Sequence, residues 1–308
     1  MYYSMAAMTD QSDQSASIDF FNVFGEPLVK LLIALGNKLS REWPTKYQNV
    51  TRARELFVMH LRIAHLTYRS ALYLGGNIPA DERRLPEFCV SLPVLNRAIL
   101  DSLFTVLFIL GDVPNRCVWF RESDWRESRL ELERYTAEYG NLAEWKTYLE
   151  DLSKVCDMGL ALTNLSAGQA ANPKALRSWP NPGAMVSYGV SPNAPLPPVQ
   201  TFMKYLNDFF YADLSQQAKL GGTGLSKRGA FLLDEIRSLP GTDSQIKKYR
   251  YSQIGQAVAL VLALASEIEA HFNFGLRNDA LFVWNLAAPV IVVVNEVYEK
   301  RYRALLGI

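Results

Sequence analysis

Four basic side chains recur along one stretch of the sequence at a spacing suited to anion binding. Placed at 100° per residue on a helix over residues 49–74, they fall within an arc of roughly 80°; they are Arg54, Arg62, His65 and Arg69. The surrounding segment 38–70 holds seven basic and two acidic residues, whereas the formal net charge of the whole chain is +1. Such a face is typical of surfaces that contact phosphate or RNA. The alternative is a solvated basic face balanced by acidic neighbours.

Arg54 and His60 lie six residues apart on the same predicted helix and together could cleave RNA. A histidine can serve as acid and base for attack by a 2′-hydroxyl, and an arginine can stabilise charge on the phosphate. The Arg-x5-His spacing resembles the catalytic motif of the higher-eukaryote-and-prokaryote nucleotide-binding domain, a helical family with many RNA-cleaving toxins. The resemblance implies a catalytic Arg54–His60 pair at a dimer. On one helix, however, the two side chains point about 120° apart, and a surface or core histidine is the alternative.

A charged pair interrupts the most apolar predicted helix. The sequence LPVLNRAILDSLFTVLFIL begins at residue 92 and places Arg97 and Asp101 one turn apart. Because a charge is rarely buried alone, we expect the two to pair or to face a polar cavity together. A pair would fix the packing of the helix. A cavity would instead make Asp101 a base or ligand anchor and Arg97 an anion binder for a small molecule or nucleotide.

These helices also resemble a known family. The segments RARELFVMHLRIAHLTYRSALYL, LNRAILDSLFTVLFIL and NRCVWFRESDWRESRL are similar to the bacterial domain-of-unknown-function family 5677, over about residues 50–215. Members typically carry Arg-x-x-x-Glu on an apolar helix, and Arg97 and Asp101 match it with Asp in place of Glu. The resemblance implies a helical fold and gives no established activity.

A second signature of that family, approximately Tyr-x-Ser-x-x-x-His, is matched in outline by KYLNDFFYA. Tyr205 fits the tyrosine, Asn207 replaces the serine, and Tyr211 stands where the histidine would be. The resemblance makes these three residues candidate binding residues, with a phenol in place of any imidazole. Read from the residues alone, the same segment is an aromatic packing face.

Composition limits the classes of protein to consider. Apolar residues make up 49% and charged residues 20% of 308 residues, as in ordinary soluble globular chains. Three cysteines and three histidines predict reduced thiols, no metal site and no cofactor. The N-terminal segment lacks the pattern of a signal peptide, and the apolar runs 257–265 and 281–294 are shorter than the roughly 18 residues of a span. We therefore expect a cytoplasmic protein without membrane contact.

Hydrophobic periodicity predicts an all-α bundle of about seven to nine helices. It forms a single domain over residues 19–308, after a disordered tail at 1–18, and residues 166–200 form one long Pro/Gly-rich irregular insertion. The predicted helices cover residues 19–39, 49–74, 92–112, 115–139, 141–162, 201–217, 230–238, 250–274 and 278–304, the last kinked at Pro289.

Three functions fit these patterns. The first is a bacterial-type, non-catalytic interaction or regulatory module, with a second copy of the chain as one expected partner. The second is an RNA-cleaving or defence-type effector that uses Arg54 and His60. The third is a small-molecule or nucleotide binder with a pocket at Arg97 and Asp101.

Overall fold

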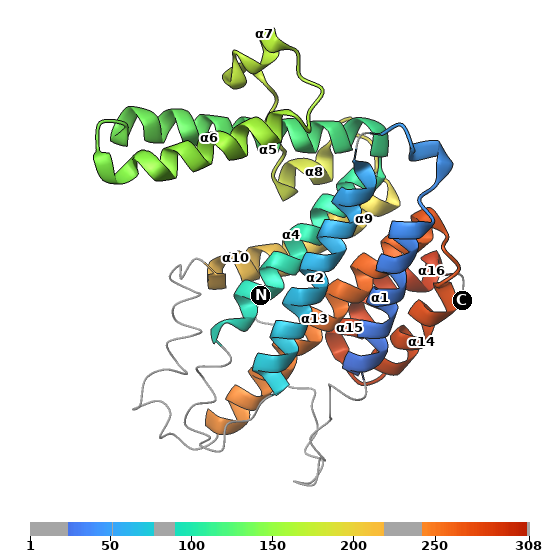
Figure 1. Ribbon diagram of the computed structural model, residues 1–308. Helices are drawn as coiled ribbons and strands as arrows, with labels where there is room; N and C mark the ends of the chain where they lie inside the picture. Colours follow the sequence, from blue (N-terminus) through green and yellow to red (C-terminus); the bar gives the residue numbers. More distant parts are fainter. Residues whose placement is uncertain (1–23, 51, 77–89, 219–241, 307–308) are drawn as a thin grey trace.

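The computed structural model describes residues 24–50, 52–76, 90–218 and 242–306, which are helical almost throughout (Figure 1). No strand occurs in these ranges, and nine α-helices have seven residues or more. The prediction of an all-α bundle is confirmed. The longer helices are α1 (Glu26–Arg41), α2 (Ala53–Gly76), α4 (Leu92–Leu110), α5 (Val113–Tyr139), α6 (Lys146–Leu160), α9 (Pro198–Leu206), α10 (Ala212–Ala218), α13 (Thr242–Phe272) and α14 (Arg277–Ala287).

Helix α13 forms the centre of the bundle. Every residue from 257 to 269 is buried. The stretch 257–265 is apolar on all faces and can be stable only when neighbours cover it. Helices α2, α4 and α15 (Val292–Val297) provide that cover. Gly255 permits a close approach, since a Cβ there would lie 2.7 Å from Cγ2 of Ile291, just before α15.

Helix α4 is the second buried helix and packs between α13 and α2. Its buried Asn96 donates from Nδ2 to the backbone oxygen and Oε1 of Gln253 on α13, at 2.9 and 3.0 Å, so these donors are not left unpaired, which would be costly. Leu92–Leu110 and Lys248–Phe272 are long and apolar enough to cross a membrane by length and composition. Both are mostly buried inside the bundle, so this finding leaves membrane contact open.

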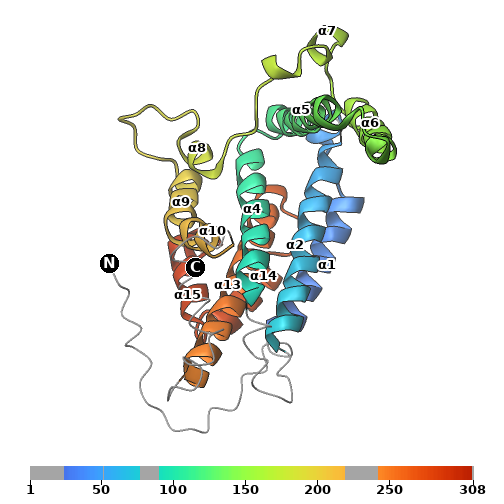
Figure 2. The same ribbon diagram turned by 90° about the vertical axis from the view of Figure 1, so that its left-hand side faces the viewer.

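Helices α5 and α6 form a hairpin that projects beyond the rest of the bundle (Figure 1). In the side view they are seen nearly end-on, above the ends of α4 and α2 (Figure 2). Nε1 of Trp125 on α5 donates to the backbone oxygen of Cys156 on α6 at 3.1 Å. At the far end, the rings of Tyr139 and Trp145 stack at 4.1 Å. Trp145 belongs to the 3₁₀ turn η4 (Ala143–Trp145) that joins the two helices.

The segment 166–200 is irregular, as predicted, but it packs against the bundle. It holds only short helices: α7 (Ala167–Ala170), η5 (Pro173–Ala175) and α8 (Pro182–Ser187). The backbone N–H of Trp179 donates to Oγ of Ser123 on α5 at 2.6 Å. The Trp179 ring also lies edge-on to Phe108 on α4 and Phe120 on α5. Aromatic packing therefore orders a stretch that has no helical periodicity.

The predicted single helix over 278–304 is wrong, because the chain breaks at Pro289. Helix α14 ends at Ala287 and α15 starts at Val292, followed by a π-helix, η7 (Tyr298–Tyr302), and by α16 (Arg303–Leu305). Proline lacks the N–H that continues a helix. A second π-helix, η6 (Asn207–Tyr211), interrupts the predicted helix 201–217. The predicted tail 1–18 and the predicted helix 230–238 lie outside the described residues.

Candidate functional site

The predicted basic face of α2 does reach the surface. Arg54, Arg62 and Arg69 are exposed and His65 is partly buried. Arg54 contacts the neighbouring Glu55, with 3.7 Å between its guanidinium and the carboxylate. Burial and the nearby Arg69 lower the pKa of His65. The four side chains therefore form a row along α2 rather than converge on a cavity.

His60 faces inward, away from Arg54. Its ring lies edge-on to Phe120 of α5 at 5.6 Å, and its Nδ1 is buried with no hydrogen-bond partner among the described residues. Burial lowers the pKa of His60 to about 4, because a desolvated imidazole resists protonation. Arg54 and His60 share no hydrogen bond or ring contact in this part of the chain, and near pH 7 the imidazole is neutral.

An apolar stripe that the sequence analysis did not identify lies next to the basic row on α2. Its four members recur at helical spacing and are about half exposed or more: Met59 at 56%, Ile63 at 47%, Leu66 at 52% and Tyr73 at 67%. On a helical wheel they span roughly 80°, with Arg62 and Arg69 along one edge. The sequence shows that these residues are apolar, but composition alone does not reveal which apolar residues lie on the surface instead of in the core.

Arg97 and Asp101 pair, as one of the two alternatives predicts. Nε of Arg97 donates to both carboxylate oxygens at 3.1 and 3.0 Å. The Arg97 side chain is 16% exposed and the Asp101 side chain 50% exposed. The guanidinium also lies 3.4 Å above the ring centre of Tyr211 and donates to Oγ of Ser215 on α10. The cluster connects α4 to η6 and α10, so its polar groups serve helix packing.

Tyr205 and Asn207, the other two residues matched to Tyr-x-Ser-x-x-x-His, lie apart from the cluster around Arg97. Tyr205 packs its ring against Phe209 at 5.1 Å and against Phe210 at 5.9 Å. Asn207 donates from Nδ2 to the carboxylate of Asp208 at 3.4 Å. The structure thus brings Tyr211 to Arg97 and Asp101, while Tyr205 faces a different surface.

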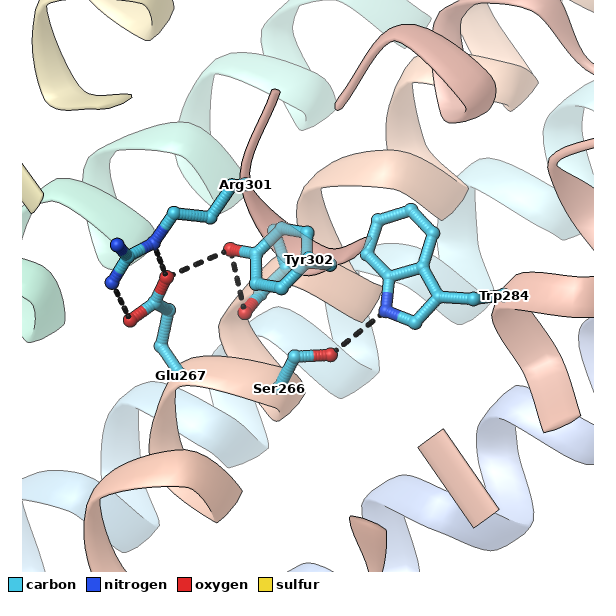
Figure 3. A network of polar contacts seen from close by, with 6 residues as sticks. Ser266, Glu267, Trp284, Arg301 and Tyr302 are labelled. Atoms are coloured by element: carbon cyan, nitrogen blue, oxygen red, sulfur yellow. Dashed lines mark hydrogen bonds and ion pairs between the residues drawn. The ribbon is translucent and has the colours of Figure 1, made fainter. Parts of the chain in front are cut away.

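A buried ion pair that the sequence analysis missed connects α13 to η7 (Figure 3). Nε and an Nη of Arg301 donate to the two carboxylate oxygens of Glu267 at 2.7 and 3.0 Å. The two side chains are 10% and 5% exposed. The hydroxyl of Tyr302 donates to the same carboxylate at 3.1 Å, and burial raises the pKa of this phenol well above its usual range.

A second polar contact lies beside this pair. Nε1 of buried Trp284 donates to Oγ of Ser266 at 3.0 Å (Figure 3). Glu269 on the same helix accepts from the backbone N–H groups of Phe274 and Leu276 at 3.2 and 2.9 Å. The sequence does carry a signal for these contacts: SEIE follows the uncharged run AVALVLALA directly, so two carboxylates stand in a fully buried helix.

A groove of about 490 Å³ opens between the two π-helices. Tyr205, Phe209 and Phe210 line one side, Gln256 of α13 contributes from the centre, and side chains of α15 and η7 line the other side, including Glu296 and Lys300. The volume lies within the range of small-molecule sites, about 300–1,000 Å³. Of the predicted site residues, only Tyr205 lines this groove.

The described residues offer no evident metal centre, since they contain no group of three or more His, Cys, Asp or Glu side chains able to hold a metal ion. Cys117 and Cys156 are free and buried, and burial raises the pKa of Cys117 to about 12. Such a thiol stays protonated near neutral pH and is a poor nucleophile. Cys89 lies outside the described residues.

Comparison of the chain with protein-family models, curated proteins and solved structures found no match. The resemblances to family 5677 and to the nucleotide-binding domain therefore stay predictions.

Proposed function

We propose that the protein is a non-catalytic interaction module that associates with a second copy of itself through the exposed face of α2. The observation that carries this proposal is the apolar stripe Met59, Ile63, Leu66 and Tyr73. Contiguous exposed apolar surface is expensive in water and usually marks a place where another molecule binds. The Arg62 and Arg69 edge gives the stripe the polar rim of a protein interface.

The sequence of α2 favours a second copy as the partner. In a two-fold arrangement the same face meets itself, and a two-fold axis perpendicular to α2 makes the two helices run antiparallel. With Ile63 near the two-fold axis, Met59 of one copy lies opposite Leu66 of the other. In the same register Glu55 lies opposite Arg69, so carboxylate meets guanidinium on both sides of the axis. These two pairs are thus complementary in one register, whereas Tyr73 lies opposite the residues just before α2.

The catalytic alternatives have weaker support. An imidazole with a pKa near 4 is not protonated at neutral pH and would be a poor general acid. Arg97 binds Asp101, Tyr211 and Ser215, which leaves little of its guanidinium for a ligand. The basic row on α2 remains compatible with RNA or another phosphate-bearing ligand, and it lies beside the proposed dimer face.

The experiment is size-exclusion chromatography with light scattering over a range of protein concentrations. We expect the wild-type mass to rise toward that of a dimer, and Leu66→Asp to remain a monomer because two carboxylates would enter the apolar contact. Val155→Asp on α6 is the matched control, since Val155 is 56% exposed, and it should behave as wild type. A wild-type chain that stays monomeric at every concentration, or equal effects of both variants, would refute the proposal.

A further inference from the structure

We infer that the groove between η6 and η7 binds a free amino acid that has an apolar side chain. The inference is independent of the α2 interface and uses only residues that line the groove. Three features support it: two opposite charges and one acceptor that have no partner among the described residues, and an aromatic wall.

The two charges are those of Glu296 and Lys300. Both are exposed, and neither has an ion pair within 4 Å among the described side chains, although Glu299 beside them pairs with Arg303 at 2.9 Å. A Glu and a Lys four residues apart would normally face each other on an α-helix. The π-helix η7 begins between them, at Tyr298, and changes the number of residues per turn. The groove is thus lined by one carboxylate and one ammonium that have no ion-pair partner in the described ranges.

The acceptor is Oε1 of Gln256. This atom is buried without a hydrogen-bond partner in the described part of the chain, and its side chain lines the groove from the central helix α13. An unsatisfied buried acceptor costs on the order of 1–3 kcal/mol. A ligand N–H would remove this cost.

The aromatic wall consists of Tyr205 and Phe209, whose ring centres are 5.1 Å apart. Phe209 is 52% exposed and lines the groove. An apolar side chain of a ligand would add contact with its ring. A π-helix borders the groove on each side, and such segments occur frequently at functional sites because they displace the side chains next to them.

A zwitterionic amino acid satisfies these features together. Its α-ammonium group would pair with Glu296 and donate to Gln256, and its α-carboxylate would pair with Lys300. Its side chain would lie against Phe209. A simple amine would leave Lys300 unpaired, and a simple carboxylate would leave Glu296 and Gln256 unpaired. The proposed ligand class therefore needs both charged groups, one apolar side chain and no further charge.

The test is calorimetric titration of the full chain with L-leucine and L-phenylalanine, together with N-acetyl-L-leucine, which lacks the ammonium, and isoamylamine, which lacks the carboxylate. We expect at least one of the two amino acids to bind, with both leucine derivatives at least about tenfold weaker than leucine. Binding of neither amino acid, or isoamylamine as tight as leucine, would overturn the inference.

Variants test the assignment of the groups. Glu296→Gln and Lys300→Gln should each weaken binding at least about tenfold, whereas Glu133→Gln and Lys154→Gln on the α5–α6 hairpin should not. All four side chains are exposed, and circular dichroism verifies that each variant is folded. Unchanged binding in both groove variants would place the ligand elsewhere and overturn the inference.

Discussion

His60 is an ionisable residue held in an environment that suppresses its charge. Burial lowers its pKa to about 4, whereas in the unfolded chain the pKa should be close to 6.5. At a pH between these values the unfolded chain takes up a proton at this site and the folded chain does not. Folding stability must therefore fall as the pH drops from about 6.5 toward 4.

We expect His60→Gln to reduce this loss of stability. Between pH 7 and pH 5 the site should contribute about 2 kcal/mol of the decrease in the free energy of unfolding. His65 and His271, whose pKa values burial also lowers, contribute in the same direction and remain in the variant. Urea denaturation of both proteins at the two pH values measures the difference. An equal loss in wild type and variant would show that His60 is accessible to protons in the folded state.

The contacts and the exposure of single residues are the features that the sequence predicts least completely. The pairing of Arg97 with Asp101 could be predicted from two opposite charges one turn apart in an apolar helix. That the Asp101 side chain is half exposed could not, and an exposed carboxylate contributes little to stability. The further contacts of Arg97 with Tyr211 and Ser215 join segments more than one hundred residues apart, which helical periodicity cannot bring together.

Among the ion pairs of the described residues, the one between Glu267 and Arg301 is the most buried. It joins the central helix α13 to the π-helix η7 through two hydrogen bonds. Removing one partner leaves a desolvated charge unpaired, whereas removing both leaves an apolar contact. The two substitutions should therefore be strongly non-additive.

We expect Glu267→Ala to lower the free energy of unfolding by roughly 3–5 kcal/mol, and the double variant Glu267→Leu, Arg301→Met to lower it much less. Glu299→Ala is the control, since the pair of Glu299 with Arg303 is exposed and its loss should change the free energy of unfolding far less. Chemical denaturation measures all three. A double variant at least as unstable as Glu267→Ala would mean that the pair contributes net stability.

Hydrophobic periodicity in the sequence predicts the long α-helices but not the π-helices. Helices α2, α4, α5 and α13 could be located from the spacing of apolar residues, because each buries a stripe or a whole surface. The π-helices could not, since i→i+5 hydrogen bonds leave no distinct hydrophobic period over five residues. The segment 166–200 carries prolines that exclude long helices, and its packing depends on rings such as Trp179, whose partners Phe108 and Phe120 lie far away in sequence.

In the whole molecule the positive and negative charges are unevenly distributed, although the net charge is close to zero. The face of α2 combines an apolar stripe with an arginine edge, and Glu55 is the acidic residue within α2. In the antiparallel register, Glu55 of each copy meets Arg69 of the other, so the association should weaken with added salt. Arg62 lies near the axis, where it faces its own counterpart, and it opposes association to a smaller extent.

This register is testable by exchanging the charges. Glu55→Arg and Arg69→Glu should each weaken the dimer, because each places like charges opposite one another across the interface. The double variant restores an opposite pair with reversed sign, so we expect its dissociation constant to return close to the wild-type value. Analytical ultracentrifugation at low salt measures all four proteins.

The double variant separates this register from other ways of using the α2 face. If Arg69 instead bound an acidic group elsewhere on the second copy, Arg69→Glu and the double variant would both remain weak, because no new partner would be supplied. If the arginine edge served RNA, Arg69→Glu would abolish RNA binding and the double variant would not recover it, while the mass of the protein in solution would not change. Recovery of the dimer in the double variant alone requires Glu55 and Arg69 to face each other across a two-fold axis near Ile63.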